Sequence, residues 1–352
     1  MRKIFLFLTT LAATSLFAQS NVLSFFTGTY EGVTYCLPDT RIEITVDAAC
    51  ISRTPGEFNR YAERYLRIDN AITSANSYWE ITGASVATNG KPNAEKSFTI
   101  KFSNNSACNV KLAEGGIIEG INISGNEEKA QEMPAAASRR EKADATRYFT
   151  EEMLQATSTA KLAELAAKEI YTIRESKFAI TRGEADNMPH DGVSMQLILK
   201  ELDEQERALT ELFTGRTDTV YYSERYLIEP EAGKNMDKEI IFRFSRKLGF
   251  VEKDDLAGEP VYCTLRDLKT VYIPAPEEAE KKKAAKKEGV RYNIPGKASL
   301  QLSTRSRKLF DGEISVAQFG ATEMLSRDLL GKKANARILF DTATGGIISI
   351  EK

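Results

Sequence analysis

Two short patterns occur twice in this chain in the same order, and they constrain its fold more than any other feature of the sequence. Residues 32–38 (GVTYCLP) share four of seven positions with residues 289–295 (GVRYNIP). Residues 113–118 (AEGGII) share five of six with residues 343–348 (ATGGII). Because an opening and a closing pattern recur in the same order, the sequence predicts an internal duplication with a shorter second copy.

The two patterns have the same physical meaning in both copies. Apolar side chains alternate through residues 33–37 and 290–294, which is typical of a half-buried strand. A proline cannot donate to a strand ladder, so we expect the proline after each run to end its strand or to lie at an edge. Paired glycines can adopt positive φ, so we expect each pair at the tight turn of a hairpin. The structural marks of the repeat are therefore Gly32, Tyr35, Pro38, Gly115, Gly116, Gly289, Tyr292, Pro295, Gly345 and Gly346.

Between the copies the hydrophobic period changes from two to 3.6 residues, which predicts helices. Residues 148–215 contain two amphipathic stretches, and we expect Gly183 to end the first and Asp191 to cap the second. This pattern predicts an antiparallel helical hairpin whose apolar stripes form either core or a groove for a partner. His190 lies in the turn, where an exposed or capping side chain is the leading interpretation and a metal ligand or a proton shuttle is the alternative.

The remaining segments are strands and polar connections. Alternating apolar residues predict strands at 220–222, 240–244, 261–265 and 271–273. Two stretches lack an apolar face and read as linkers. The expected organisation is a signal peptide at 1–18, a β-rich unit at 19–123, a linker at 124–147, the helical hairpin at 148–215, a β-rich segment at 216–276, a charged linker at 277–288 and a second β-rich unit at 289–352.

The N-terminal residues resemble an export signal. Arg2 and Lys3 precede an apolar stretch at 4–17, and Ala18 offers a small residue before a cleavage point. The alternative is an uncleaved N-terminal anchor, but the apolar stretch is shorter than the about 20 residues that a membrane span needs. We therefore expect an exported protein without a transmembrane segment after signal removal.

Composition excludes several function classes. The chain has 48 basic and 50 acidic residues, so its charge gives no reason to expect a nucleic-acid partner. A single histidine argues against most metal sites and most Ser-His or Cys-His catalytic arrangements. We predict no catalytic residue, no cofactor and no metal.

The four cysteines leave two possibilities open. Cys36, Cys50, Cys108 and Cys263 form neither a CxxC motif nor a metal-ligand spacing. An exported protein permits disulfides, and four thiols allow three connectivities. Reduced cysteines buried in strands are at least as good an interpretation, since two of the four lie in apolar strand-like runs.

Several segments resemble an uncharacterised family. These are GVTYCLPDTRIEI at 32–44, GEFNRYAERYL at 56–66, Gln318-Phe319-Gly320 and FDTATGGIISI at 340–350. They are similar to the family catalogued as domain of unknown function 4831, from secreted proteins of Bacteroidetes. The resemblance spans nearly the whole mature chain, implies a location in the cell envelope, and brings no active site with it.

Together these observations predict an α+β protein in which two related β-rich units flank an inserted helical hairpin. The leading hypothesis is an exported periplasmic or surface-associated protein that binds or scaffolds without catalysis or cofactor. Its partner would be an envelope protein or a glycan. The alternative is an envelope hydrolase that acts on glycans through paired carboxylates, and a deep cleft with two converging carboxylates would favour it.

Overall fold

A computed structural model of the protein describes residues 32–100, 109–123, 144–185, 191–272, 289–326 and 336–351. The fold is mixed α and β, with antiparallel sheets predominating over helices. The expected signal peptide, the charged linker at 277–288, most of the linker at 124–147, His190 and Cys108 lie outside the described residues.

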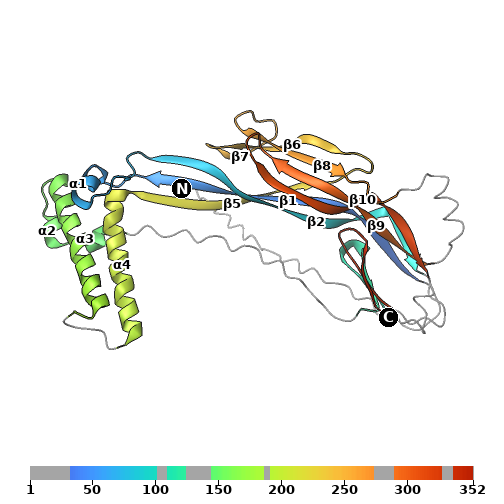
Figure 1. Ribbon diagram of the computed structural model, residues 1–352, viewed down its shortest axis with the longest axis horizontal. Helices are drawn as coiled ribbons and strands as arrows, with labels where there is room; N and C mark the ends of the chain where they lie inside the picture. The colour runs from blue at the N-terminus through green and yellow to red at the C-terminus, as the bar shows by residue number, and fades with distance from the viewer. Residues whose placement is uncertain are drawn as a thin grey trace, which may run out of the picture.

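A long three-stranded sheet forms the arm of the molecule (Figure 1). Its central strand is β1 (Val33–Thr54), which pairs antiparallel with β2 (Asn76–Ile100) on one side and with β5 (Arg216–Ile228) on the other. At about 3.3 Å per residue, the 22 residues of β1 span roughly 70 Å. We call β1, β2 and β5 together the arm.

A five-stranded sheet covers one face of the arm. It consists of β6 (Met236–Ser245), β7 (Gly249–Val251), β8 (Glu259–Asp267), β9 (Gly289–Ser303) and β10 (Lys308–Ser326) in the order β10-β9-β8-β6-β7. The main core lies between the two sheets, because alternate residues of β1 point into it. These residues, Ile42, Ile44 and Val46, are fully buried against Phe242 and Leu300.

A third, smaller sheet joins two strand pairs that lie far apart in the sequence. Its order is β12-β11-β4-β3, built from β3 (Val110–Leu112), β4 (Ile118–Ile121), β11 (Arg337–Phe340) and β12 (Ile347–Glu351). The two strand pairs meet where β4 pairs with β11. The 3-10 turn η2 (Glu114–Gly116) connects β3 and β4. Residues 110–121 and 337–351 therefore share one hydrophobic core.

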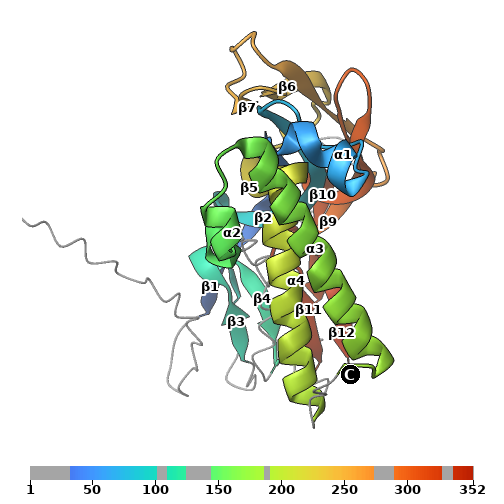
Figure 2. The same ribbon diagram turned by 90° about the vertical axis from the view of Figure 1, so that its left-hand side faces the viewer.

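The helices gather at the other end of the arm (Figures 1 and 2). The long helices α3 (Thr159–Arg182) and α4 (Gly192–Thr214) lie side by side and run in opposite directions. Short elements pack around their upper part: η1 (Asn59–Tyr61), α1 (Ala62–Leu66), η3 (Ala145–Tyr148) and α2 (Glu151–Leu154). Within the described residues, no helix is both long enough and apolar enough to span a membrane.

Local signals placed the ends of the long helices correctly. Gly183 ends α3 in the left-handed conformation at φ 74°. Asp191 caps α4, since its carboxylate accepts a hydrogen bond from the backbone N–H of Ser194 at 2.7 Å. Both features confirm expectations from the sequence.

The prolines of the opening patterns do not end their strands; each lies where its strand has a strand partner on one side only within the described residues, as the edge alternative expects. Pro38 lies within β1 and Pro295 within β9, each at a break in register. In the arm the pairing passes from Cys36–Ser97 to Pro38–Pro92. An advance of two residues along β1 is therefore matched by five residues along β2, which forms a bulge. The bulge interrupts the regular hydrogen bonds between the strands at the proline, which has no N–H to donate. The strand can therefore continue beyond the proline.

A second bulge of the same size lies at the corresponding place in the other sheet. Pairing there passes from Ile294–Ala321 to Gly296–Val316. An advance of two residues along β9 is therefore again matched by five residues along β10. The expectation of a strand at 271–273 was wrong: Val271 and Tyr272 lie outside any strand, because β8 already ends at Asp267.

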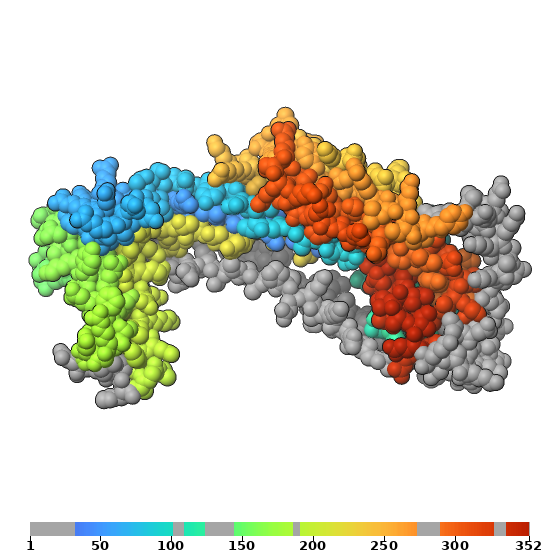
Figure 3. All heavy atoms as spheres, in the orientation of Figure 1, coloured from blue at the N-terminus to red at the C-terminus, as the bar shows by residue number. Residues whose placement is uncertain are grey.

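The described residues together form an arch (Figure 3). The helix pair α3–α4 and the third sheet project from the same side of the arm, one at each end. We call the side between them the concave side. The five-stranded sheet lies on the opposite, convex side.

Candidate functional site

The repeat marks surround a junction at which β1, β2, β9, β10 and the loop between β11 and β12 meet. At its centre is Tyr35, whose ring is 1% exposed. Its hydroxyl accepts a hydrogen bond from the backbone N–H of Arg291 at 2.7 Å and donates to the carbonyl of the same residue at 2.9 Å. Burial raises the pKa of this hydroxyl, against a smaller lowering by the backbone hydrogen bond and the charge of Arg291. Tyr35 therefore joins the two opening patterns as a neutral phenol.

The prolines and diglycines of the repeat contact one another in the same junction. A Cβ on Gly345 would lie 2.8 Å from Cδ of Pro38, and one on Gly346 would lie 3.1 Å from Cδ of Pro295. Gly345 also has φ +73°, a conformation that favours glycine. The first opening pattern thus packs against the second closing pattern, so two segments far apart in the sequence are in direct contact.

The first residues of the two opening patterns have matching surroundings. A Cβ on Gly32 would meet the carbonyl oxygen of Ile100 at 2.3 Å, and a Cβ on Gly289 would meet that of Leu325 at 2.2 Å. In both sheets the glycine thus stands against the end of the neighbouring strand. Tyr292, unlike Tyr35, is only half-buried.

The remaining marks lie in the loop between β3 and β4. Gly115, at φ +73°, leaves room for Pro92, whose ring would otherwise meet a Cβ at 2.3 Å. Gly116 has open space around its Cα. The ten marks therefore shape contacts between strands and bring no reactive group together.

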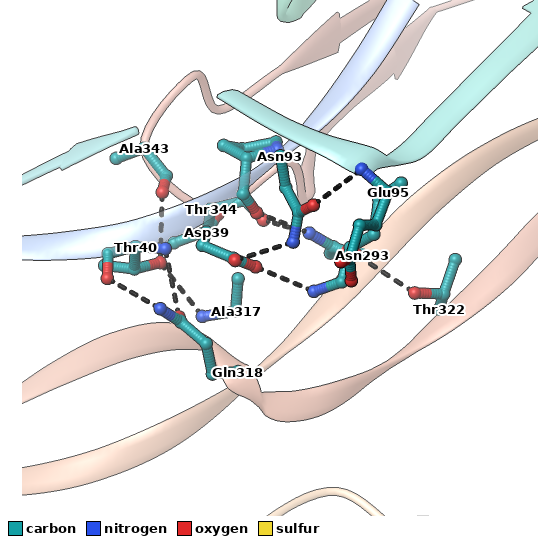
Figure 4. Close-up of polar contacts among 12 residues, drawn as sticks. Asp39, Thr40, Asn93, Glu95, Asn293, Ala317, Gln318, Thr322, Ala343 and Thr344 are labelled. Atoms are coloured by element: carbon teal, nitrogen blue, oxygen red, sulfur yellow. Dashed lines mark hydrogen bonds and ion pairs between the residues drawn. The ribbon is translucent and has the colours of Figure 1, made fainter. Parts of the chain in front are cut away.

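A buried threonine, Thr40 of β1, bonds both β10 and the loop between β11 and β12 within the junction (Figure 4). Its hydroxyl donates to the carbonyl of Ala343 at 3.0 Å and accepts from the N–H of Ala317 at 2.9 Å. Its backbone N–H donates to Oε1 of Gln318 at 3.0 Å, and Nε2 of Gln318 donates to its carbonyl at 2.9 Å. The segments around residues 40, 318 and 343, all of which carry the family resemblance, thus meet here.

Asn293 makes the corresponding link from β9. Its amide Nδ2 donates to the carbonyl of Thr344 at 2.8 Å and to that of Pro38 at 3.2 Å. Its Oδ1 accepts from the hydroxyl of Thr322 at 3.2 Å. Thr40, Asn293 and Thr344 are buried polar residues whose side chains all have partners, so the junction acts as a lock between strands.

Charged groups converge at a second place, between α3 and α4, where a shallow pocket lies. Arg174 and Lys177 of α3 both contact the carboxylate of Glu206 at 2.6 Å, and Lys177 also contacts Asp203 at 2.5 Å. Burial would raise the pKa of Glu206, but the hydrogen bonds and charges of Lys177 and Arg174 lower it overall. A glycosidase acid requires the opposite shift, so this arrangement suits an ion-pair clamp between two helices.

The thiols of the described residues are reduced. Cys36, Cys50 and Cys263 are free, and Cys263 is fully buried. Burial, followed by the charge of Glu239, raises the pKa of the Cys263 thiol to about 12, which leaves it protonated and unreactive. Within the described residues, no group of three or more His, Cys, Asp and Glu side chains is placed to hold a metal ion.

The outer strand of the arm, β5, offers a different kind of site. Within the described residues it pairs with β1 alone, so the backbone groups along its other side, which we call the open edge, have no strand partner. Every residue from 219 to 225 is exposed, including Val220, Tyr221 and Tyr222. The open edge faces the concave side between the helix pair and the third sheet (Figure 1).

The sequence predicts a strand here, and tyrosines at strand spacing are most simply interpreted as packing residues. That interpretation suits Trp79, whose ring lies 4.7 Å from that of Tyr222 and against Gly249. It does not suit Tyr221, which is 58% exposed. The run 219–223 contains no charge and no proline, and this was the available signal, since edge strands normally carry such residues.

Comparison with known proteins identifies a family but no activity. The family model described as Domain of unknown function (DUF4831) matches residues 31–348. Neither a curated protein nor a solved structure matches the chain.

Proposed function

Since the chain belongs to this family of unknown function, we propose its role from geometry: it is an exported envelope protein that binds a partner along the concave side of its arm, without catalysis. The observation that carries the proposal is the open edge of β5. Seven consecutive exposed residues, which include two tyrosines and whose outer backbone groups have no strand partner among the described residues, form a surface on which a polypeptide can add as a strand.

The junction supports this role by making the arch stiff. Thr40, Asn293 and Tyr35 fix the arm to the second and third sheets through hydrogen bonds that are buried or half-buried. A scaffold gains from such pre-organisation, because a rigid site pays less conformational entropy on binding.

We also propose that the two β-rich units arose by duplication. Three features support this. Each unit is a long strand pair followed by a short hairpin with a diglycine, and in both long pairs a bulge sets two residues of one strand against five of the other. Gly32 and Gly289 also make matching contacts with the end of the neighbouring strand. The bulges place Asn93 and Gln318 beside Asp39 and Thr40, so they supply the side chains that join the units.

The export part of the proposal rests on residues 1–18 and on the family resemblance. N-terminal sequencing of the protein recovered from cell envelopes is expected to begin at Gln19. A protein that begins at Met1 in the soluble cell fraction would contradict it.

Site-specific photo-crosslinking in cells tests the binding role. A photoreactive amino acid in place of Tyr221, on the open edge, is expected to give a discrete adduct. The matched control replaces Leu256, which is 82% exposed in the loop between β7 and β8 on the convex side. No adduct at position 221, or the same adducts at both positions, would count against the proposal.

A further inference from the structure

We infer that the open edge of β5 takes residues 21–30 of a second copy of this chain as a fourth strand of the arm. The inference rests on the proposed binding role and names its partner. It makes the protein a self-assembling one, in which each copy both donates a strand and accepts one.

The accepting side is a neutral stretch with charged ends. Thr219 to Ser223 carry no charge, whereas Asp218 precedes them and Glu224 and Arg225 follow. Asp218 lies within ion-pair distance of Arg216, and Arg225 lies 3.7 Å from Glu43 of β1. A neutral partner segment of about five residues fits between these charges, while a charged one would bury charge against Val220 and the tyrosines.

Residues 21–30 have the matching chemistry. Their sequence, NVLSFFTGTY, contains no charge and no proline, and half of it is Val, Leu, Phe or Tyr. Such residues favour strands. Pairing with β5 would satisfy the backbone groups of both strands and would cover Tyr221 and Val220.

The segment cannot reach the open edge of its own copy. It joins the described chain at Gly32, next to the start of β1, whereas the nearest end of β5, Ile228, pairs with Ile42. The intervening 10 residues of β1 span about 33 Å, and a segment returning alongside would use about as many of its own. From Glu31 backwards, only residues 19–21 would remain to pair. A second copy is free of this constraint.

Strand donation of this kind is heterologous, because the donating and accepting surfaces differ. A heterologous contact continues from copy to copy unless the rotation closes a ring. The protein is therefore expected to form chains that lengthen with concentration.

Two complementary variants of the full chain from Gln19 test this directly. Phe25→Asp charges the donated segment, and Tyr221→Lys charges the open edge, where the side chain is already 58% exposed. Gln19→Asp and Leu256→Lys are the matched controls, one outside the segment and one on the convex side. Circular dichroism would verify that each variant is folded.

Sedimentation velocity at protein concentrations between about 1 and 100 μM would measure the mass of the particles that each variant forms. The wild type and both controls grow in mass with concentration, whereas each test variant stays monomeric. Mixing the two test variants restores pairing, because one keeps an intact edge and the other an intact segment. The mixture stops at dimers.

Three outcomes would overturn the inference: a wild type that is monomeric throughout, test variants that associate like the wild type, or a mixture that stays monomeric. The photo-crosslink at position 221 separates this failure from that of the proposed function. An adduct of twice the chain mass supports both. An adduct with a different protein keeps the binding role and rejects self-assembly, and no adduct rejects both.

Discussion

At the scale of single residues, the hydroxyl of Thr40 is the most informative group in the molecule. It is 1% exposed and bonds both Ala343 and Ala317, which belong to segments about 280 to 300 positions further along the chain. Replacing it with an isosteric methyl keeps the packing but leaves a buried carbonyl and a buried N–H without partners. We expect Thr40→Val to lower the free energy of unfolding by about 2 kcal/mol, measured by urea denaturation.

Thr34→Val is the matched control, because Thr34 lies in the same strand and its hydroxyl bonds only that of Thr99 on the exposed surface. It should change the free energy of unfolding by less than about 0.5 kcal/mol. Equal effects of the two substitutions would show that the junction does not hold the sheets together.

The residue-level marks show what a sequence can and cannot indicate. The glycines and prolines could be recognised from the sequence because their special backbone conformations are properties of the residues themselves. Their partners were not, since the contact of Tyr35 with Arg291 spans 256 positions and depends on how two sheets cross. The sequence could not decide whether Pro38 ends its strand or lies at an edge for the same reason, since the bulge that accommodates it is formed by β2.

At the scale of elements, helices were more predictable than strands. The ends of α3 and α4 follow from Gly183 and Asp191, which act on neighbouring residues. The lengths of β1 and β2 could not be read from alternation, because the pattern breaks at the bulge although the pairing continues beyond it. The open edge of β5 was hidden because its exposure depends on which strands lie beside it.

The ion-pair clamp between α3 and α4 gives a prediction at this scale. The side chain of Glu206 is 19% exposed and accepts from both Arg174 and Lys177. Glu206→Gln keeps its shape but removes the charge, so we expect the free energy of unfolding to fall by about 2 kcal/mol at pH 7. Glu211→Gln, which removes an i,i+4 pair with Arg207, should cost about 0.5 kcal/mol or less.

The effect of Glu206 should depend on pH in one direction. Its pKa is lowered in the folded state, so its contribution is complete above the unfolded value near 4.5 and is lost as the pH falls through the folded pKa. The difference between wild type and Glu206→Gln should therefore shrink between pH 5 and pH 3, as measured by chemical denaturation across that range. A difference that stays constant or grows in acid would contradict the clamp.

At the scale of the whole molecule, the β part of the fold depends on contacts between segments far apart in the sequence. The third sheet needs β4 and β11, and the junction needs residues 40 and 343. The helix pair, in contrast, consists of two helices that are neighbours in the sequence, although its core also takes in Phe58, Ala62 and Leu66 from the segment between β1 and β2. The chain thus combines a largely local helical part with a β part that forms only when segments far apart in the sequence meet.

This division yields an elongated arch, and small-angle X-ray scattering can measure it. A compact chain of this length would have a radius of gyration of about 20 Å. The arm alone spans roughly 70 Å, and the helix pair and third sheet lie at its opposite ends, so mass is distributed far from the centre.

We expect a radius of gyration clearly above about 20 Å and a maximum dimension above about 70 Å. The measurement should use Phe25→Asp, whose expected monomeric state removes elongation caused by assembly. A globular profile near 20 Å would mean that the arch folds back on itself, and the concave side would then no longer expose β5 to a partner. Scattering from this one variant therefore tests the geometry on which both the binding role and the strand exchange depend.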